Sequence, residues 1–266
     1  MKSLDLWGRG YSDTPLSCRH DVRLFASQIL LALSSSPLSW VGNGNNFRIV
    51  AFSLGGPISL AFVDAFPSSV QSLALLGPAG LLRKLPDGYD ELMHQPEFAP
   101  SQESLRDKVP QILGVQPSGP AISIQLDQKR VVALEPGPSR LDRSFDMAAI
   151  LQWQFDHHHG HIHSFQDTIR YGPLQNQEHS WGKVCDIIAG RACPDSALHN
   201  SRLLVFFGRE DGIVVGEETI EDILKLLPPS HLQVEYLPGG HGFPYPNSDS
   251  ITETLLLEWA PSHPVA

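Results

Sequence analysis

The chain has 266 residues, 41% of them hydrophobic and 18% charged, so it can bury a substantial core and global disorder is excluded. Its formal net charge of −10 argues against nucleic acid and anionic membrane surfaces as partners, and no run approaches the roughly 18 apolar residues of a membrane span. The odd number of cysteines, without a C-x-x-C pair, predicts free thiols in a reducing compartment, and the expected location is the cytoplasm.

The first segment is expected to end a strand and to enter a turn. Gly8 and Gly10 are typical turn residues, and Ser12, Asp13 and Pro15 continue the loop. Residues 20–36 then carry apolar side chains at helical spacing. The sequence therefore predicts a loop followed by an amphipathic helix.

A serine stands between a predicted strand at residues 48–52 and a predicted helix that opens near Pro57. The segment Ala51-Phe52-Ser53-Leu54-Gly55 matches the nucleophile elbow G-x-S-x-G, except that Ala replaces the first Gly. Small residues must flank such a turn, because larger side chains would collide. Ser53 is therefore a candidate nucleophile, although a serine in this position can equally be a helix N-cap.

The alternation of strands and helices continues and then stops. Residues 70–77 predict a second buried strand, which completes a parallel strand–helix–strand unit. From about residue 81 to residue 182 the chain is rich in Pro, Gln, His and Arg, and only 104–113 and 142–170 favour helices, the second with a break near Gly160. A hundred irregular residues inside a sheet would be unusual, so we predict an inserted, mainly helical cap at residues 81–182.

The sheet resumes in the last third of the chain. Residues 201–208 form a continuous apolar run and residues 232–237 alternate, which predicts two further strands. Helices are predicted at 217–227, with Glu at its start and Lys near its end, and at about 248–259. We therefore expect a core made of residues 1–80 and 183–266.

Four short segments stand at the ends of predicted strands: Asp5-Leu-Trp-Gly-Arg-Gly-Tyr-Ser12, Phe52-Ser-Leu-Gly-Gly56, Gly208-Arg-Glu-Asp211 and Gly239-Gly-His-Gly242. In this order they resemble the motifs of the serine type of α/β-hydrolase, and the chain is similar to fungal members of that superfamily. The resemblance implies an α/β fold with a mostly parallel, doubly wound sheet. It also implies that the family's first strands, and the loop that supplies a second oxyanion N–H, are missing before Asp5.

The resemblance implies a role for each motif. The family order of nucleophile, acid and histidine falls on Ser53, Asp211 and His241, and Leu54 N–H would be an oxyanion donor. Glu210, next to Asp211, is an alternative acid. Serine is a weak nucleophile that needs an adjacent base, so His241 would take its proton during formation of an acyl-enzyme.

The implied function is a serine hydrolase that cleaves a carboxylic ester, thioester or lactone, and the fungal likeness points to secondary-metabolite or toxin biosynthesis. Phe52, Trp153 and Phe243 are candidate contacts for a small apolar ester-type substrate. Two alternatives stay open: hydrolysis of a carbon–carbon bond by the same triad, and a catalytically weak binding protein or truncated remnant that keeps the fold. The oligomeric state is open as well.

A histidine-rich segment, Asp156-His-His-His-Gly-His-Ile-His163, lies in the predicted cap. Imidazoles at 157, 159, 161 and 163 could bind a metal ion, and those at 157 and 161 would share a helix face. The segment has no H-E-x-x-H pattern, and the serine mechanism requires no metal. We therefore predict a structural or pocket-lining role for the cluster, and neither a metal nor a cofactor is expected.

Overall fold

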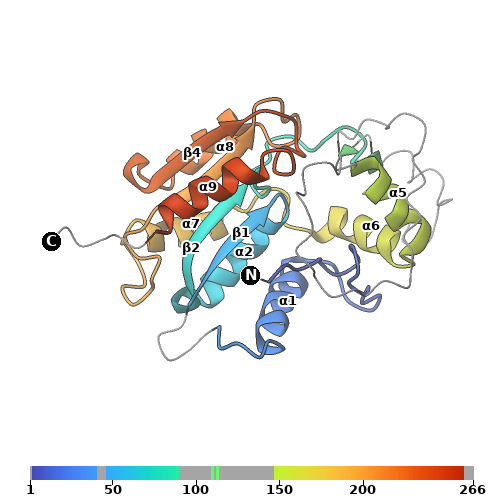
Figure 1. Cartoon of the computed structure of the whole chain (residues 1–266), viewed down its shortest axis with the longest axis horizontal. Helices are drawn as coiled ribbons and strands as arrows, with labels where there is room; N and C mark the ends of the chain where they lie inside the picture. The colour runs from blue at the N-terminus through green and yellow to red at the C-terminus, as the bar shows by residue number, and fades with distance from the viewer. Residues whose placement is uncertain (1, 41–45, 90–108, 111, 114–146, 261–266) are drawn as a thin grey trace, which may run out of the picture.

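The computed structural model describes residues 2–40, 46–89, 109–110, 112–113 and 147–260. At its centre lies a parallel sheet in the order β1-β2-β3-β4 (Figure 1). The strands are β1 Phe47–Phe52, β2 Val70–Leu76, β3 Leu203–Gly208 and β4 Leu232–Leu237. All four predicted strands are confirmed to within two residues at each end.

The two inner strands are buried on both faces of the sheet. In β2, Leu73 and Leu75 belong to one apolar cluster, whereas Ala74 and Leu76 belong to a second cluster on the opposite face. All six residues of β3 are buried. Burial on both faces explains why these strands are continuous apolar runs rather than alternating ones.

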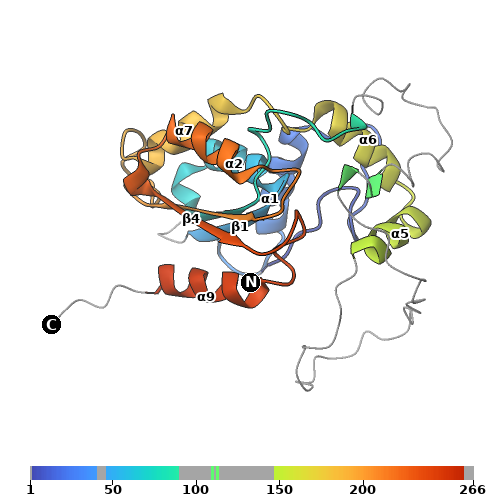
Figure 2. The ribbon, with the colours of Figure 1, turned by 90° about the horizontal axis from the view of Figure 1, so that it is seen from above.

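Helices cover both faces, so the sheet is doubly wound as predicted (Figure 2). On one face the cluster includes Phe62, Trp181 and Ile223, which come from three different helices. These helices are α2 Gly55–Ala65, α7 Glu178–Ile188 and α8 Gly216–Leu224. The other face is covered by α9 Ser248–Glu258, through Ile251 and Leu255.

The remaining core helix, α1 Val22–Ser34, packs against α2. Its N-cap is Asp21, whose carboxylate accepts hydrogen bonds from the backbone N–H groups of Arg23 and Leu24. Short 3₁₀ turns, η1 Pro67–Ser69 and η3 Pro229–His231, lead into β2 and β4. None of the helices in the described part of the chain has the length and hydropathy that a membrane crossing would need.

Residues 2–20 form a loop, so the expected strand end before Gly8 is wrong. The backbone of this loop is hydrogen-bonded to the side chain of Gln28 on α1 and not to a neighbouring strand. The Gln28 amide donates to Asp5 O and accepts from Trp7 N, both at 2.9 Å. The predicted turn at Gly8 and Gly10 is confirmed by their positive φ angles of 77° and 53°.

Two helices, α5 Met147–His157 and α6 His161–Tyr171, lie beyond the carboxyl ends of the strands (Figures 1 and 2). The gap between them confirms the predicted break near Gly160. The predicted helix at 104–113 lies mostly outside the described residues.

The predicted boundary between cap and core at residue 182 falls inside α7, whose Trp181 is fully buried in the core. Gly80 N donates to Leu174 O at 2.8 Å, and Gln177 N donates to Gly80 O at 3.0 Å. These bonds join the two ends of the intervening segment. The cap bounds of 81–182 stay a prediction.

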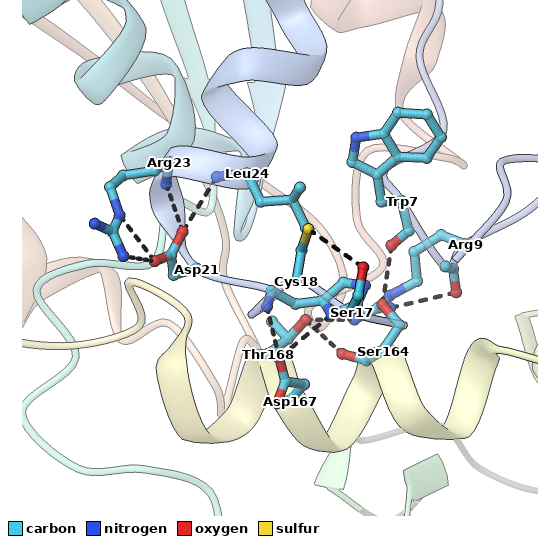
Figure 3. A network of polar contacts seen from close by, with 12 residues as sticks. Trp7, Arg9, Ser17, Cys18, Asp21, Arg23, Leu24, Ser164, Asp167 and Thr168 are labelled. Carbon is cyan, nitrogen blue, oxygen red and sulfur yellow. Dashed lines mark hydrogen bonds and ion pairs between the residues drawn. The ribbon is translucent and has the colours of Figure 1, made fainter. Parts of the chain in front are cut away.

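The N-terminal loop is bound along α6 by polar contacts (Figure 3). The Arg9 guanidinium donates to Ser164 Oγ and to Thr168 Oγ1, and Ser164 Oγ donates to Trp7 O at 2.9 Å. Burial of the guanidinium lowers the pKa of Arg9 to about 10, so the side chain stays charged at neutral pH. The loop and α6 therefore form one hydrogen-bonded unit.

His161 is buried in the same contact, with 1% of its surface exposed. Its Nδ1 lies 3.0 Å from Gly8 O, so Nδ1 carries the proton and donates. Burial, together with the positive charge of Arg9, lowers the pKa of His161 to about 4. The folded protein thus holds this imidazole neutral.

We expect His161 to make the protein less stable as the solution is acidified. In the unfolded chain it would protonate near pH 6.5, so the stabilisation present above that pH is lost as the pH falls toward the folded pKa of about 4. The loss is on the order of 2 kcal/mol between about pH 7 and pH 4.5.

Urea unfolding of the wild type and of His161→Asn at the two pH values measures the contribution of His161 to this loss of stability. The Asn amide can still donate to Gly8 O but does not titrate, so the variant should lose less free energy of unfolding on acidification. An equal loss in both proteins would contradict the assignment.

Candidate active site

Ser53 lies at the sharp turn between β1 and α2 with a φ of 52°, in the left-handed region that non-glycine residues seldom adopt. Three backbone hydrogen bonds hold it there. Ser53 N donates to Leu76 O at 2.9 Å, and Ser53 O accepts from Gly56 N at 2.9 Å and from Ala79 N at 3.1 Å. Such strain persists only where surrounding bonds fix it, and it is concentrated at functional sites.

Small residues make room for the turn, as the sequence predicted. A Cβ on Gly55 would lie 3.5 Å from Ala51 Cβ, an ordinary contact, so the turn accommodates Ala in place of the first Gly of the motif. A Cβ on Gly56 would lie only 2.8 Å from Pro78 Cβ, and this position therefore requires glycine.

The side chains of Ser53, His241 and Asp211 form a continuous hydrogen-bonded chain. His241 Nε2 is 2.8 Å from Ser53 Oγ, and His241 Nδ1 is 2.8 Å from Asp211 Oδ2. The imidazole is 10% exposed and the Asp211 side chain is fully buried. Ser53 Oγ thus contacts an imidazole. The N-cap position of α2 is instead Leu54, with no side-chain capping bond.

Asp211 is held by its own backbone contacts. Its Oδ1 accepts from Ile213 N at 2.9 Å and from Val214 N at 3.0 Å, which leaves Oδ2 directed at His241. The neighbouring Glu210 is exposed, and its carboxylate accepts from Gly239 N. Of the two acids that the sequence left open, Asp211 is the one that is hydrogen-bonded to the His241 imidazole in the described part of the chain.

The three residues meet because each follows a different parallel strand. Ser53 follows β1, Asp211 follows β3 and His241 follows β4, and the carboxyl ends of parallel strands share one edge of a sheet. At the end of β2, Gly77 has a φ of 48°, and a Cβ there would lie 3.4 Å from Asp211 Oδ2. The positive φ favours glycine at this position, whereas the contact of a Cβ with the acid would be an ordinary one.

The residues predicted to contact substrate fall in different places. The Phe52 ring lies 5.0 Å from the His241 ring and 6.1 Å from that of Tyr245. Phe243 is 1% exposed and belongs to the cluster under α9, so it packs beneath the site and does not line it. The turn after His241 directs Phe243 inward, which residue spacing did not reveal.

Trp153 lies on α5, where its ring stacks on His157 at 5.7 Å and tilts against Tyr11 at 5.4 Å. Its contact with substrate stays a prediction. Leu54 immediately precedes α2, and the first N–H groups of a helix lack acceptors within the helix. Leu54 N–H is therefore available beside Ser53, as an oxyanion donor requires.

Sequence reasoning missed Tyr245, whose ring completes the aromatic group around Phe52 and His241. Burial raises the pKa of Tyr245, so its hydroxyl stays neutral at physiological pH. An aromatic residue four positions after the candidate histidine was the available signal.

The histidines at 157–161 make local contacts. His157 Nδ1 lies 3.1 Å from Trp153 O, and His158 Nε2 lies 2.7 Å from Ser12 O. With His161 bound to Gly8 O, these contacts connect the helices to the loop. In the described part of the chain the set predicted from spacing does not converge on one point, and His163 belongs to a different group.

A model of the family described as alpha/beta hydrolase fold matches residues 3–247. The chain belongs to this family. A curated relative, the 2-hydroxy-6-oxo-2,4-heptadienoate hydrolase of Pseudomonas putida, is 30% identical over 106 residues, which are 39% of this chain and 35% of that enzyme. The match thus spans about a third of the relative's length.

Solved structures are similar over nearly the whole chain. They include 2-hydroxy-6-oxo-6-phenylhexa-2,4-dienoate hydrolase from Rhodococcus (TM-score 0.58, 17% identity, 97% of this chain and 78% of that one). Another is the enol-lactonase of Burkholderia xenovorans (TM-score 0.59, 13% identity, 97% and 79%). A third is a meta-cleavage product hydrolase from Pseudomonas fluorescens (TM-score 0.57, 14% identity, 96% and 77%). At these identities the likeness establishes the α/β-hydrolase fold.

Replacing the acids separately distinguishes their roles. Asp211→Asn should lower kcat by about 10³–10⁴-fold, because the amide no longer fixes the imidazole tautomer or stabilises its charged form. Glu210→Gln, the matched control, should leave kcat nearly unchanged. Steady-state hydrolysis of an activated ester measures kcat in both variants. A large loss of kcat in the Glu210 variant alone would show that Glu210, and not Asp211, is the acid.

Proposed function

We propose that this α/β-hydrolase is a serine hydrolase that transfers an acyl group first to Ser53 and then to water. The observation that carries the proposal is the bonded chain from Ser53 through His241 to Asp211, with 2.8 Å at both steps. A serine hydroxyl is a weak nucleophile at neutral pH, and an adjacent oriented base is what activates it.

In the proposed acylation step, Ser53 Oγ attacks the substrate carbonyl carbon while its proton passes to His241 Nε2. Asp211 stabilises the resulting imidazolium through Nδ1–H. Collapse of the tetrahedral intermediate breaks the bond to the leaving group, which takes the proton from His241. Water then attacks the acyl-enzyme, with His241 acting again as the base.

Charge develops on the carbonyl oxygen during both attacks. Leu54 N–H, at the start of α2, is the proposed donor to this oxyanion. The positive end of the α2 dipole supports it from the same side. A preformed donor of this kind typically contributes about 10²–10³ in rate.

The proposed substrates are small carboxylic esters, thioesters or lactones. Phe52 and Tyr245 give the surroundings of His241 an apolar character that suits an acyl chain. The fold shared with an enol-lactonase is compatible with this class. Action on fungal secondary metabolites stays a prediction from the resemblance, and a cytoplasmic location stays a prediction from the cysteine content.

Hydrolysis of a carbon–carbon bond is the second candidate, and the relatives favour it. One curated relative and several similar structures are named as hydrolases of 2-hydroxy-6-oxo-dienoates or of meta-cleavage products. The same serine, histidine and acid could serve such a reaction, provided that the carbon leaving group is stabilised by conjugation.

Stopped-flow hydrolysis of p-nitrophenyl esters of graded chain length tests the proposal. We expect a burst of nitrophenol, equal to one equivalent of enzyme, followed by slower turnover, because an activated ester releases nitrophenol in a fast acylation step and deacylation then limits the rate. Ser53→Ala should abolish both phases. A folded wild type without burst or turnover would favour the binding-protein alternative. A Ser53→Ala variant that retains them would show that another residue is the nucleophile.

Competing substrates then separate the two reaction classes. A 2-hydroxy-6-oxo-dienoate, followed by loss of its visible absorbance, is compared with p-nitrophenyl butyrate and a simple lactone. Ester and lactone turnover with a larger kcat/KM supports the first candidate. A larger kcat/KM for the dienoate would move the assignment to carbon–carbon hydrolysis.

A further inference from the structure

A second polar cluster lies where the N-terminal loop meets α6. It consists of His20, at the end of the loop, and of His163 and Asp167, which are four residues apart on α6. Residues with this spacing lie on the same face of a helix. The potential ligand atoms of the three side chains all lie within 4.8 Å of one another.

Asp167 fixes the orientation of His20. Its Oδ2 accepts from the backbone N–H of His20 at 2.6 Å and lies 3.3 Å from His20 Nδ1. This distance between Nδ1 and Oδ2 is close to the separation of roughly 3.4 Å between two ligand atoms of a tetrahedral zinc ion. A cation bound by both atoms would take the place of the proton that Nδ1 otherwise donates to the carboxylate.

The Nε2 nitrogens of the two histidines lack hydrogen-bond partners among the described residues. His20 is fully buried. The two rings meet edge to face, with their centroids 5.6 Å apart. Leaving buried imidazole nitrogens unbonded is costly, and a cation bound at His163 Nε2 would satisfy one of them.

A cavity of about 170 Å³ lies beside the cluster, and His163 and Asp167 are among its lining residues. The loop that carries Cys18 passes over Asp167 (Figure 3), and Cys18 lines the same cavity. The cavity therefore offers room for an ion and its bound water. It also brings an exposed thiol to the entrance.

We propose that His20, His163 and Asp167 form a zinc-binding site. Two imidazoles and one carboxylate are a typical ligand set for Zn²⁺, whose fourth position is taken by water or thiolate. Ligands of a tetrahedral zinc ion lie roughly 2.0–2.2 Å from the ion, and therefore about 3.3–3.6 Å from one another. Small side-chain rotations would close the observed cluster around the ion.

Arg19 and Arg170 also line the cavity, and their positive charges disfavour the binding of a cation there. The Arg19 guanidinium lies over the Tyr171 ring, at 4.8 Å from its centroid. The carboxylate of Asp167 is thus the negative charge that the site requires. Replacing Asp167 by a neutral residue should therefore weaken zinc binding through the loss of its charge as well as through the loss of one ligand.

The effect of the ion would be to join the loop before α1 to helix α6. Residue spacing indicated His163 as a possible metal ligand, but it did not reveal the pairing with His20, which lies far from the histidine-rich segment. The site is separate from Ser53, His241 and Asp211, so the proposal stands or fails independently of the hydrolase function.

Titration of the chelator-treated full chain with ZnCl₂, in competition with a chromophoric chelator, tests the proposal. We expect one ion per chain. His163→Gln and Asp167→Asn should each weaken binding by at least about tenfold, a loss that even outer-shell changes reach. His159→Gln is the matched control, because His159 is exposed on the same segment and lies outside the cluster.

Cobalt supplies a second readout. Co²⁺ bound at the site should give the intense visible absorption of a four-coordinate ion. A thiolate-to-metal band that disappears in Cys18→Ser would identify the fourth ligand. Circular dichroism confirms that each variant is folded.

The wild-type titration is decisive even if a variant does not fold. Absence of stoichiometric zinc binding would overturn the proposal. Binding that His159→Gln weakens, or that the His163 and Asp167 variants retain, would also overturn it.

Discussion

The site depends on the backbone of one residue, Ser53, which is held at a positive φ between β1 and α2. The strain is small compared with the interactions that fix it. These are the bonds from Ser53 to Leu76, Gly56 and Ala79, and the burial of α2 against the sheet. Because these contacts link the ends of β1 and β2, the serine is placed by the whole parallel sheet and not by its own loop.

The same strand ends also place the other two side chains. Asp211 and His241 follow β3 and β4. The imidazole therefore contacts both partners without a ligand present. Preorganisation of this kind lowers the cost of orienting groups in the transition state. The N-terminal loop and α6 are held by a separate set of polar contacts, centred on Arg9, Ser164 and His161.

Much of this arrangement could be predicted from the sequence, and the reasons are physical. The two inner strands are buried on both faces and are therefore continuous apolar runs, and β4 was found from its alternating pattern. Motifs at the carboxyl ends of parallel strands must converge, which brought Ser53, Asp211 and His241 together. Contacts between distant segments gave no such signal. The inward direction of Phe243 and the pairing of His20 with His163 depend on tertiary packing. Helix α7 was hidden by its polar start, although Trp181, Val184 and Ile188 have helical spacing.

The central claim is that the three side chains form an activated nucleophile in the folded protein. Covalent labelling with a fluorophosphonate, read by intact mass, tests it without knowledge of the substrate. The account predicts a single adduct on the wild type, mapped to Ser53 by peptide analysis, and none on Ser53→Ala or on denatured protein. A folded wild type that remains unlabelled, or an adduct on another residue, would contradict it.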